Sequence, residues 1–250
     1  MTIPMSSTRT DSATDLLDPA GVAQTHRGDV SLAHIPPAHI HAAAPAAPTE
    51  VSVVGVTAAA NAVPTSVFGF AVVVTMLSLA NSGLLGSGKL VVPLFMIIGF
   101  FAIGIGGLFE LRNGDIFGGT FGVVYATFLL ATAVALRFFA PAADASPAVV
   151  KAFGGEVGSL FLLFALISFI FTAAARIVNR TAVAAFALLA VVLLLAGLAN
   201  IIGGSTGADL TKAAGYVGLL DGAAAFWLAT GILMNVMHGK DIIPLGAAKA

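Results

Sequence analysis

Long apolar runs separated by short polar breaks dominate the chain from residue 61 onward. The hydrocarbon core of a bilayer is about 30 Å thick, which a helix crosses in about 20 apolar residues. Six runs have this length, and they are continuous rather than alternating, which favours helices over the strands of a membrane β-barrel. The pattern predicts an all-α integral membrane protein, a bundle of six transmembrane helices. The predicted spans are residues 66–85, 90–109, 116–139, 153–175, 181–202 and 213–237.

The first 60 residues have a different composition, rich in Ala, Pro, Thr, Ser and His, without a persistent helical period. Such segments do not bury enough apolar surface to fold, so we expect a disordered N-terminal tail over residues 1–60. It does not have the apolar core of a signal peptide. The transmembrane domain then covers residues 61–246. The tail's histidines have no interleaved cysteine ligands and no cluster of acidic ligands, so no metal site is predicted.

Composition agrees with a membrane protein and narrows its chemistry. Charged residues make up 9% of the chain and hydrophobic residues 58%, whereas soluble domains carry about 25% charged residues. The net charge of −1 does not indicate binding to nucleic acid, and the absence of cysteine excludes disulfides and thiolate chemistry. The sequence contains no Ser-His-Asp set, HExxH motif or phosphate-binding loop, so we expect neither an enzyme nor a cofactor.

The distribution of basic residues predicts the orientation in the membrane. Six spans put both termini on one side, and that side holds seven Lys and Arg residues against four on the other. Without the distant Arg9 and Lys249 the balance is five against four. The positive-inside rule then predicts a multi-pass protein of the plasma membrane with cytoplasmic termini.

Two carboxylates need an explanation, because charges close to hydrocarbon are costly unless they are paired or face water. Glu110 lies in a polar stretch with Arg112 and Asp115, between the second and third spans. Asp221 lies about two turns into the sixth span. Both are candidate proton carriers. The alternative for Glu110 is a salt bridge with Arg112 or a neighbour, and for Asp221 a pairing with a neighbouring polar group.

Amide side chains mark candidate positions along a path through the bundle. Asn81 and Asn200 lie near helix ends, where lining of a pore and capping of a helix are equally good explanations. Asn61 and Pro64 mark the start of the first helix. The N-terminus of a helix favours anions, so this start is a candidate entrance for a carboxylate.

Several ordered motifs carry a resemblance to a known family. They lie at residues 61–70 (NAVPTSVFGF), 77–83 (LSLANSG), 110–125 and 231–246 (GILMNVMHGKDIIPLG). In the third, Thr120 and Tyr125 are in register with the family pattern. Residues 61–246 thus resemble the acetate uptake transporters, also called succinate–acetate transporters. Departures from the family pattern are Ala62, Thr65, Ser66, Ala80, Asp115 and Phe164.

The resemblance implies six-helix protomers that assemble into hexamers, each with its own path for small monocarboxylates and, in some members, succinate. It also implies a hydrophobic constriction of three residues, which here are Phe70, Tyr125 and Leu189. Asn61, Pro64, Asn81, Thr120 and Asn200 are the candidate entrance or substrate positions.

The predicted function is transport of small carboxylates through a narrow apolar gate, as a channel or as proton-coupled uptake. Its partners are then carboxylate anions, protons and membrane lipids. The changed motif positions leave an alternative, a membrane sensor or scaffold that does not transport and whose tail recruits partners.

Overall fold

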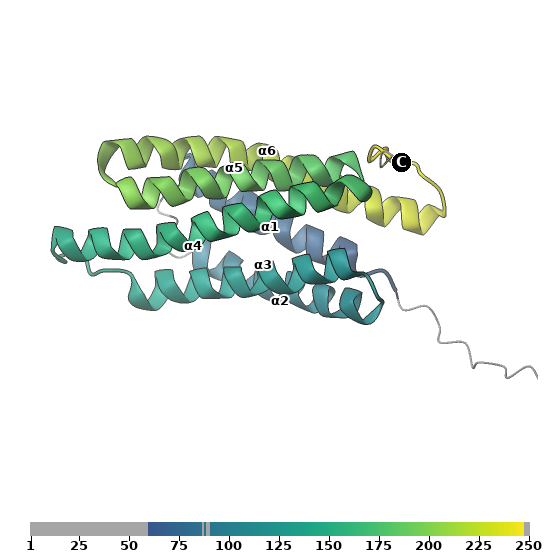
Figure 1. The fold of residues 1–250 in the computed structure, drawn as a ribbon, viewed down its shortest axis with the longest axis horizontal. Helices are drawn as coiled ribbons and strands as arrows, with labels where there is room; N and C mark the ends of the chain where they lie inside the picture. Colours follow the sequence, from purple (N-terminus) through teal and green to yellow (C-terminus); the bar gives the residue numbers. More distant parts are fainter. Residues whose placement is uncertain (1–59, 87, 89–90, 248–250) are drawn as a thin grey trace, which may run out of the picture. The chain divides into compact units, whose positions relative to one another are not determined.

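The computed structural model describes residues 60–86, 88 and 91–247, so the predicted tail lies outside the described residues except for Ala60. The described chain contains six long α-helices, each long and apolar enough to cross a membrane (Figure 1). This confirms the predicted all-α membrane bundle. The helices are α1 Val63–Asn81, α2 Val91–Arg112, α3 Ile116–Val134, α4 Pro147–Ala174, α5 Arg180–Ile202 and α6 Gly204–His238.

Several helix bounds differ from those predicted from hydropathy. α4 begins at Pro147 rather than at residue 153, because Ser146 caps it by accepting a hydrogen bond from the Val149 N–H at 3.5 Å, and proline suits the first turn. α6 begins at Gly204 rather than at residue 213. The turn between α5 and α6 consists of Gly203 and Gly204, with φ of 65° and 62°, a conformation that glycine adopts without strain.

The ends of α1 and α3 also differ from the predicted spans. α1 covers Val63–Asn81 rather than residues 66–85, with its proline in the first turn. α3 ends as a regular α-helix at Val134, and the last part of the predicted span, Ala135–Phe139, continues as a π-helical turn.

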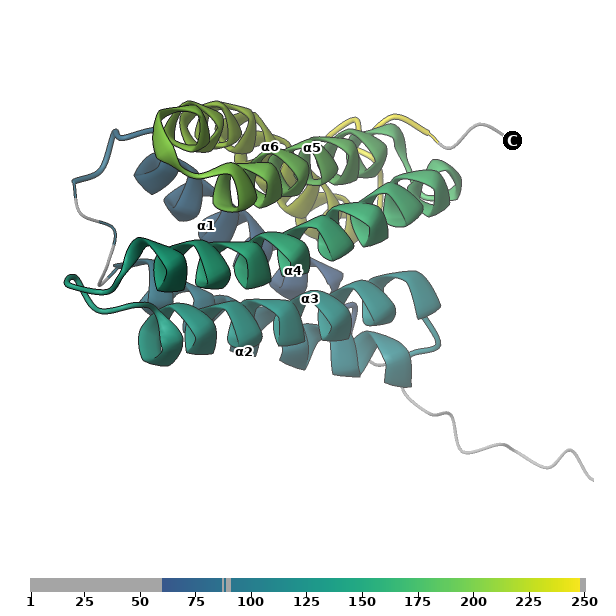
Figure 2. The same cartoon turned by 60° about the vertical axis from the view of Figure 1, so that its left-hand side comes forward.

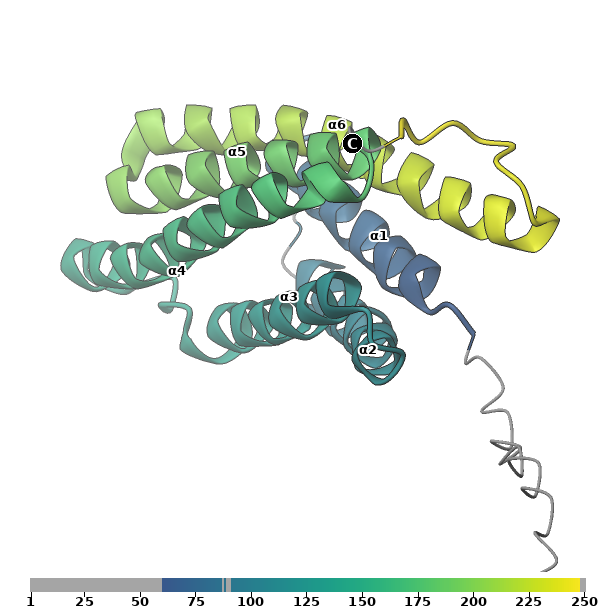
Figure 3. The ribbon, with the colours of Figure 1, turned by 45° about the vertical axis from the view of Figure 1, so that its right-hand side comes forward.

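α1 lies between two groups of helices. α2 packs along α3, while α4, α5 and α6 pack side by side in chain order, and α1 contacts both α2 and α6. Figures 2 and 3 show α1 between the α2–α3 pair and the layer of α4, α5 and α6. Side chains from α1, α3 and α5 therefore meet in the middle of the bundle.

The approach of α2 to α3 depends on two glycines. A Cβ added to Gly107 would lie 2.7 Å from the Cα of Gly122, and a Cβ added to Gly122 would overlap the backbone of Gly107. Close backbone approach of this kind, without side chains between the helices, stabilises helix pairs in membranes.

The segment after α6 folds back and completes the start of α5. Asn235 holds it, because its side-chain oxygen accepts hydrogen bonds from the Ile242 and Ile243 N–H groups at 2.8 and 2.9 Å. The segment then reaches α5, where the N–H groups of Arg180 and Thr181 donate to the Gly246 and Leu245 carbonyls. The motif at residues 231–246 thus supplies acceptors to N–H groups that have no partner inside their own helix.

Candidate functional site

Two cavities lie at opposite ends of the bundle, each of about 280 Å³. We call the first the amino-end cavity, because it lies where α1, α3 and α5 begin and is lined there by Asn61, Phe117 and Asn179. We call the second the carboxyl-end cavity, because it lies where α1 and α5 end and is lined there by Asn81 and Asn200. Each volume is several times that of one water molecule, about 30 Å³, so each has room for a small solute.

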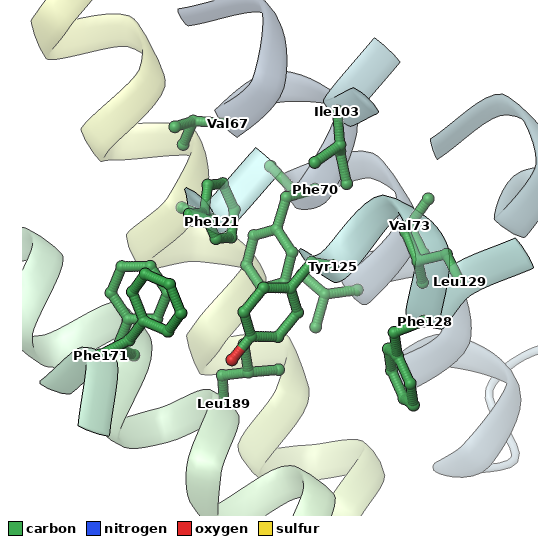
Figure 4. Packing of buried hydrophobic residues seen from close by; sticks show 14 of the residues in the cluster. Val67, Phe70, Val73, Ile103, Phe121, Tyr125, Phe128, Leu129, Phe171 and Leu189 are labelled. Carbon is green, nitrogen blue, oxygen red and sulfur yellow. The ribbon is translucent and has the colours of Figure 1, made fainter. Parts of the chain in front are cut away.

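A partition of three buried side chains separates the cavities. Phe70 and Leu189 line both cavities, and Tyr125 lines the carboxyl-end cavity beside them. Their exposed fractions are 8%, 5% and 2%. Figure 4 shows the three side chains close together, reaching in from α1, α3 and α5. The structure therefore brings the three residues of the expected constriction together between the two cavities.

Aromatic rings hold the partition in place on the side of the amino-end cavity. Phe121 packs edge-on against Phe70 with ring centres 5.8 Å apart and lies 5.2 Å from the ring of Tyr125. Behind it, Phe171 and Phe186 are stacked at 5.2 Å. Such ring pairs stabilise their arrangement beyond the burial of area, so these rings support the apolar partition.

The hydroxyl of Tyr125 forms a hydrogen bond at 2.6 Å with Ser168 of α4, which is not among the residues that line either cavity in the described part of the chain. The Ser168 hydroxyl donates to the Phe164 carbonyl at 2.7 Å. A serine has a single hydroxyl proton, so Tyr125 must donate to Ser168 and Ser168 accepts. Tyr125 therefore contributes its ring to the partition, and its one donor is already used.

Three helix N-termini surround the amino-end cavity. Asp115 accepts a hydrogen bond from the Gly118 N–H at 3.0 Å, Asn179 from the Ala182 N–H at 2.7 Å and Asn61 from the Val63 N–H at 3.0 Å. Each helix carries about half a positive charge at this end. The positive ends of α1, α3 and α5 therefore favour an anion in this cavity, although the Asp115 carboxylate offsets part of the effect.

Glu110 fixes the start of α1 rather than lining a cavity. It is buried, and its carboxylate accepts a hydrogen bond from the Ala62 backbone N–H. Asn113 adds a second link, since its side-chain nitrogen donates to the Ala60 carbonyl at 3.2 Å. The loop between α2 and α3 thus holds the entrance of the amino-end cavity in place.

The other predicted positions fall in different surroundings. Asn81 and Asn200 line the carboxyl-end cavity, and the Asn200 amide donates to the Ala196 carbonyl at 2.8 Å. Pro64 is buried in the first turn of α1. Thr120 is exposed and is not among the residues that line either cavity in the described part of the chain. Asp221 is fully buried in α6.

The model of the GPR1/FUN34/yaaH family matches residues 44–239. This chain belongs to that family. The succinate-acetate/proton symporter SatP of Escherichia coli K12 is 31% identical over 193 residues, which cover 77% of this chain and 98% of SatP. An uncharacterized protein of Methanothermobacter thermautotrophicus is 29% identical over 196 residues, which cover 74% of this chain and 90% of that protein.

Among solved structures, the bacterial acetate channel SatP superposes with a TM-score of 0.66 and 26% sequence identity, covering 75% of this chain and 99% of that one. The expected resemblance to the acetate and succinate transporters is thereby confirmed. As a member of the GPR1/FUN34/yaaH family with six apolar helices, the chain is a multi-pass membrane protein. The names of these relatives describe transport rather than catalysis.

Proposed function

We propose that this protein transports small carboxylates, acetate and succinate among them, across a membrane. The path runs from one cavity to the other past Phe70, Tyr125 and Leu189. The observation that carries the proposal is this pair of cavities, which share an apolar partition, in a member of a family with a named acetate channel and succinate-acetate symporter.

The chemistry of the amino-end cavity and of the partition suits passage of a carboxylate. The positive helix ends at the amino-end cavity attract the anion without a fixed cation, so that the anion is also able to leave. The partition then offers only rings and a leucine side chain. Hydrophobic constrictions admit small, partly dehydrated solutes and reject larger ones. Small carboxylates therefore pass more readily than bulky anions.

We further propose that the protein lies in the plasma membrane with cytoplasmic termini. Four basic residues lie in or next to the helix termini at the end where the amino-end cavity lies: Arg112, Arg176, Arg180 and Lys240. By the positive-inside rule this cavity faces the cytoplasm and the carboxyl-end cavity faces outward.

We also propose that the protomer assembles into a homo-oligomer, expected to be a hexamer. The outer face of α2 exposes large apolar side chains, including Phe101, Ile105 and Leu108, at 56%, 50% and 61%. Lipid or a second copy of the chain covers such a face in a membrane. The mass of the detergent-solubilised particle, measured by light scattering with the detergent subtracted, separates a hexamer from a monomer.

A substrate panel tests the proposed function. Purified protein in liposomes is expected to take up labelled acetate, propionate and succinate faster than empty liposomes, and not to take up ammonium. Absence of carboxylate uptake by the unmodified protein would overturn the proposal. Loss of a cellular phenotype on deleting residues 1–55, with carboxylate uptake unchanged, would instead favour the sensor or scaffold alternative.

The Tyr125→Phe substitution is expected to leave acetate uptake within about twofold of the unmodified rate, because the hydroxyl bonds Ser168 and not the solute. The Tyr125→Ala substitution removes the ring and is expected to speed passage of larger carboxylates such as succinate. Initial uptake rates in proteoliposomes measure both effects. A large loss of acetate uptake in Tyr125→Phe alone would show that the hydroxyl contacts the solute.

A further inference from the structure

Asp221 is fully buried on α6, close to residues that line each of the two cavities but lining neither itself. A Cβ added to Gly218, three residues earlier on the same face of α6, would overlap the Ser78 hydroxyl and lie 3.5 Å from Val192 of α5. Four residues after Asp221, Ala225 lines the amino-end cavity. Since Ser78 lines the carboxyl-end cavity, Asp221 is placed between a residue of each cavity, against α1 and α5.

The carboxyl group of Asp221 has no hydrogen-bond partner. Among the described residues, the buried side-chain polar atoms without a partner are both oxygens of Asp221 and the hydroxyl oxygen of Thr75. Thr75 of α1 faces the same turn of α6, because a Cβ added to Gly222, the residue after Asp221, would overlap the Thr75 hydroxyl. A buried polar group without a partner costs several kcal/mol, and a bare charge costs far more, so this position requires something that neutralises it.

Among the residues that the structure describes, no fixed charge on the helices packed near Asp221 supplies that neutralisation. α1 contains no charged or titratable residue, and the charged residue of α5 is Arg180, at its first position. Val192, which contacts α6 near Asp221, follows Arg180 by twelve residues, or about 18 Å along the helix. On the nearby α3, the Tyr125 hydroxyl is bonded to Ser168. The charged residues of α6 nearest in sequence, Asp209 and Lys212, are exposed.

The donor set favours a proton over a metal ion. In the part of the chain that the structure describes, no group of three His, Cys, Asp or Glu side chains is placed to hold a metal. Metal cations such as Ca²⁺ and Mg²⁺ take about six oxygen ligands, whereas one carboxyl and one hydroxyl offer three oxygens here. A proton needs a single oxygen and turns the carboxyl into a neutral donor and acceptor that is able to pair with Thr75.

We propose that Asp221 is a proton-binding site beside the path, loaded from the carboxyl-end cavity by way of Ser78 and Thr75, and that it couples proton movement to carboxylate transport. The proton adds to one carboxylate oxygen and later leaves from it, so no other bond forms or breaks. The coupling rests on the proposed function, whereas proton binding at Asp221 does not.

The transport test compares Asp221→Asn with the unmodified protein and with Asp209→Asn, a matched change at an exposed position of the same helix. Exchange of labelled acetate at equal pH on both sides involves no proton gradient, so its rate measures passage through the path alone. This rate is expected to be similar in all three proteins. An inward proton gradient is expected to speed uptake about tenfold in the unmodified protein and in Asp209→Asn, and not in Asp221→Asn. Retained acceleration in Asp221→Asn, or acceleration by a sodium gradient in place of protons, would overturn the proposal.

Infrared spectroscopy tests proton binding without transport. The unmodified protein is expected to show the carbonyl band of a protonated carboxylic acid that Asp221→Asn lacks and that Asp221→Glu retains at a shifted position. A spectrum unchanged by Asp221→Asn would overturn the proposal. If Asp221→Asn does not fold, the comparison with Asp221→Glu decides, because an unshifted band then assigns the proton elsewhere. A protein that shows the band but transports no carboxylate would refute the proposed function and leave the proton site standing.

Discussion

The Gly122→Leu substitution is expected to abolish the folded protein. A side chain at this position meets the backbone of Gly107 and the Ile103 carbonyl, neither of which is able to move aside as a side chain would. Overpacking costs about 1 to 3 kcal/mol where side chains can adjust, and the cost is larger here because the obstacles are backbone atoms of α2. The fraction of protein that elutes as a single species in mild detergent measures the effect, and it is expected to fall to near zero.

The control for this experiment is Gly155→Leu in α4. A Cβ added to Gly155 meets nothing within 4 Å, and leucine favours the helix more than glycine does. This variant is expected to purify as the unmodified protein does. Normal folding of Gly122→Leu would mean that α2 and α3 do not pack through these glycines.

The Leu189→Trp substitution is expected to stop transport while the protein stays folded. Leu189 lines both cavities, so a larger side chain there fills the space beside Phe70 and Tyr125. Labelled acetate uptake into proteoliposomes is expected to fall at least about tenfold, to the level of empty liposomes. Helix content and the elution profile establish that the protein is intact.

Two comparisons make the result specific. Leu194→Trp places the same side chain on the outer face of α5, at a position 36% exposed, and is expected to leave uptake unchanged. Leu189→Ala widens the partition and is expected to raise the uptake of succinate relative to acetate. Full uptake by a folded Leu189→Trp protein would mean that the solute does not pass Leu189.

Hydropathy predicted the six helices but not all of their lengths. The length of an apolar run reflects the thickness of the hydrocarbon core of the bilayer. A helix can continue beyond that core into more polar sequence, for example where a side chain caps its first turn. α4 therefore extends back to Pro147, where Ser146 caps it. α6 extends back to the Gly203–Gly204 turn without a side-chain cap, through residues too polar to count as a span.

Some residues of the candidate site were predicted from the sequence, and others were not. Phe70, Tyr125 and Leu189 followed from the family resemblance, and the structure brings them together. Thr120 lies five residues before Tyr125, about 140° around the helix, so it faces away from the partition. Helical spacing could have indicated this.

Contacts between helices could not be predicted in the same way, because they depend on how each helix is rotated and placed. The sequence offered Arg112 or a neighbour as a partner for Glu110, whereas the structure gives it the Ala62 N–H. It also gave no sign that Ser168 holds the hydroxyl of Tyr125, since a helical serine usually bonds its own preceding turn.

The solute is expected to pass through both cavities, and the absence of cysteine from the chain allows a direct measurement. Single cysteines are introduced at Ala182 in the amino-end cavity, at Ala196 in the carboxyl-end cavity and at the exposed Ala143 outside both. Each is labelled with a charged thiol reagent, and labelling is verified by mass. We predict that labelling at Ala182→Cys or Ala196→Cys reduces acetate uptake to the level of empty liposomes, and that labelling at Ala143→Cys does not. Unchanged uptake after complete labelling at both cavity positions would contradict the proposed path.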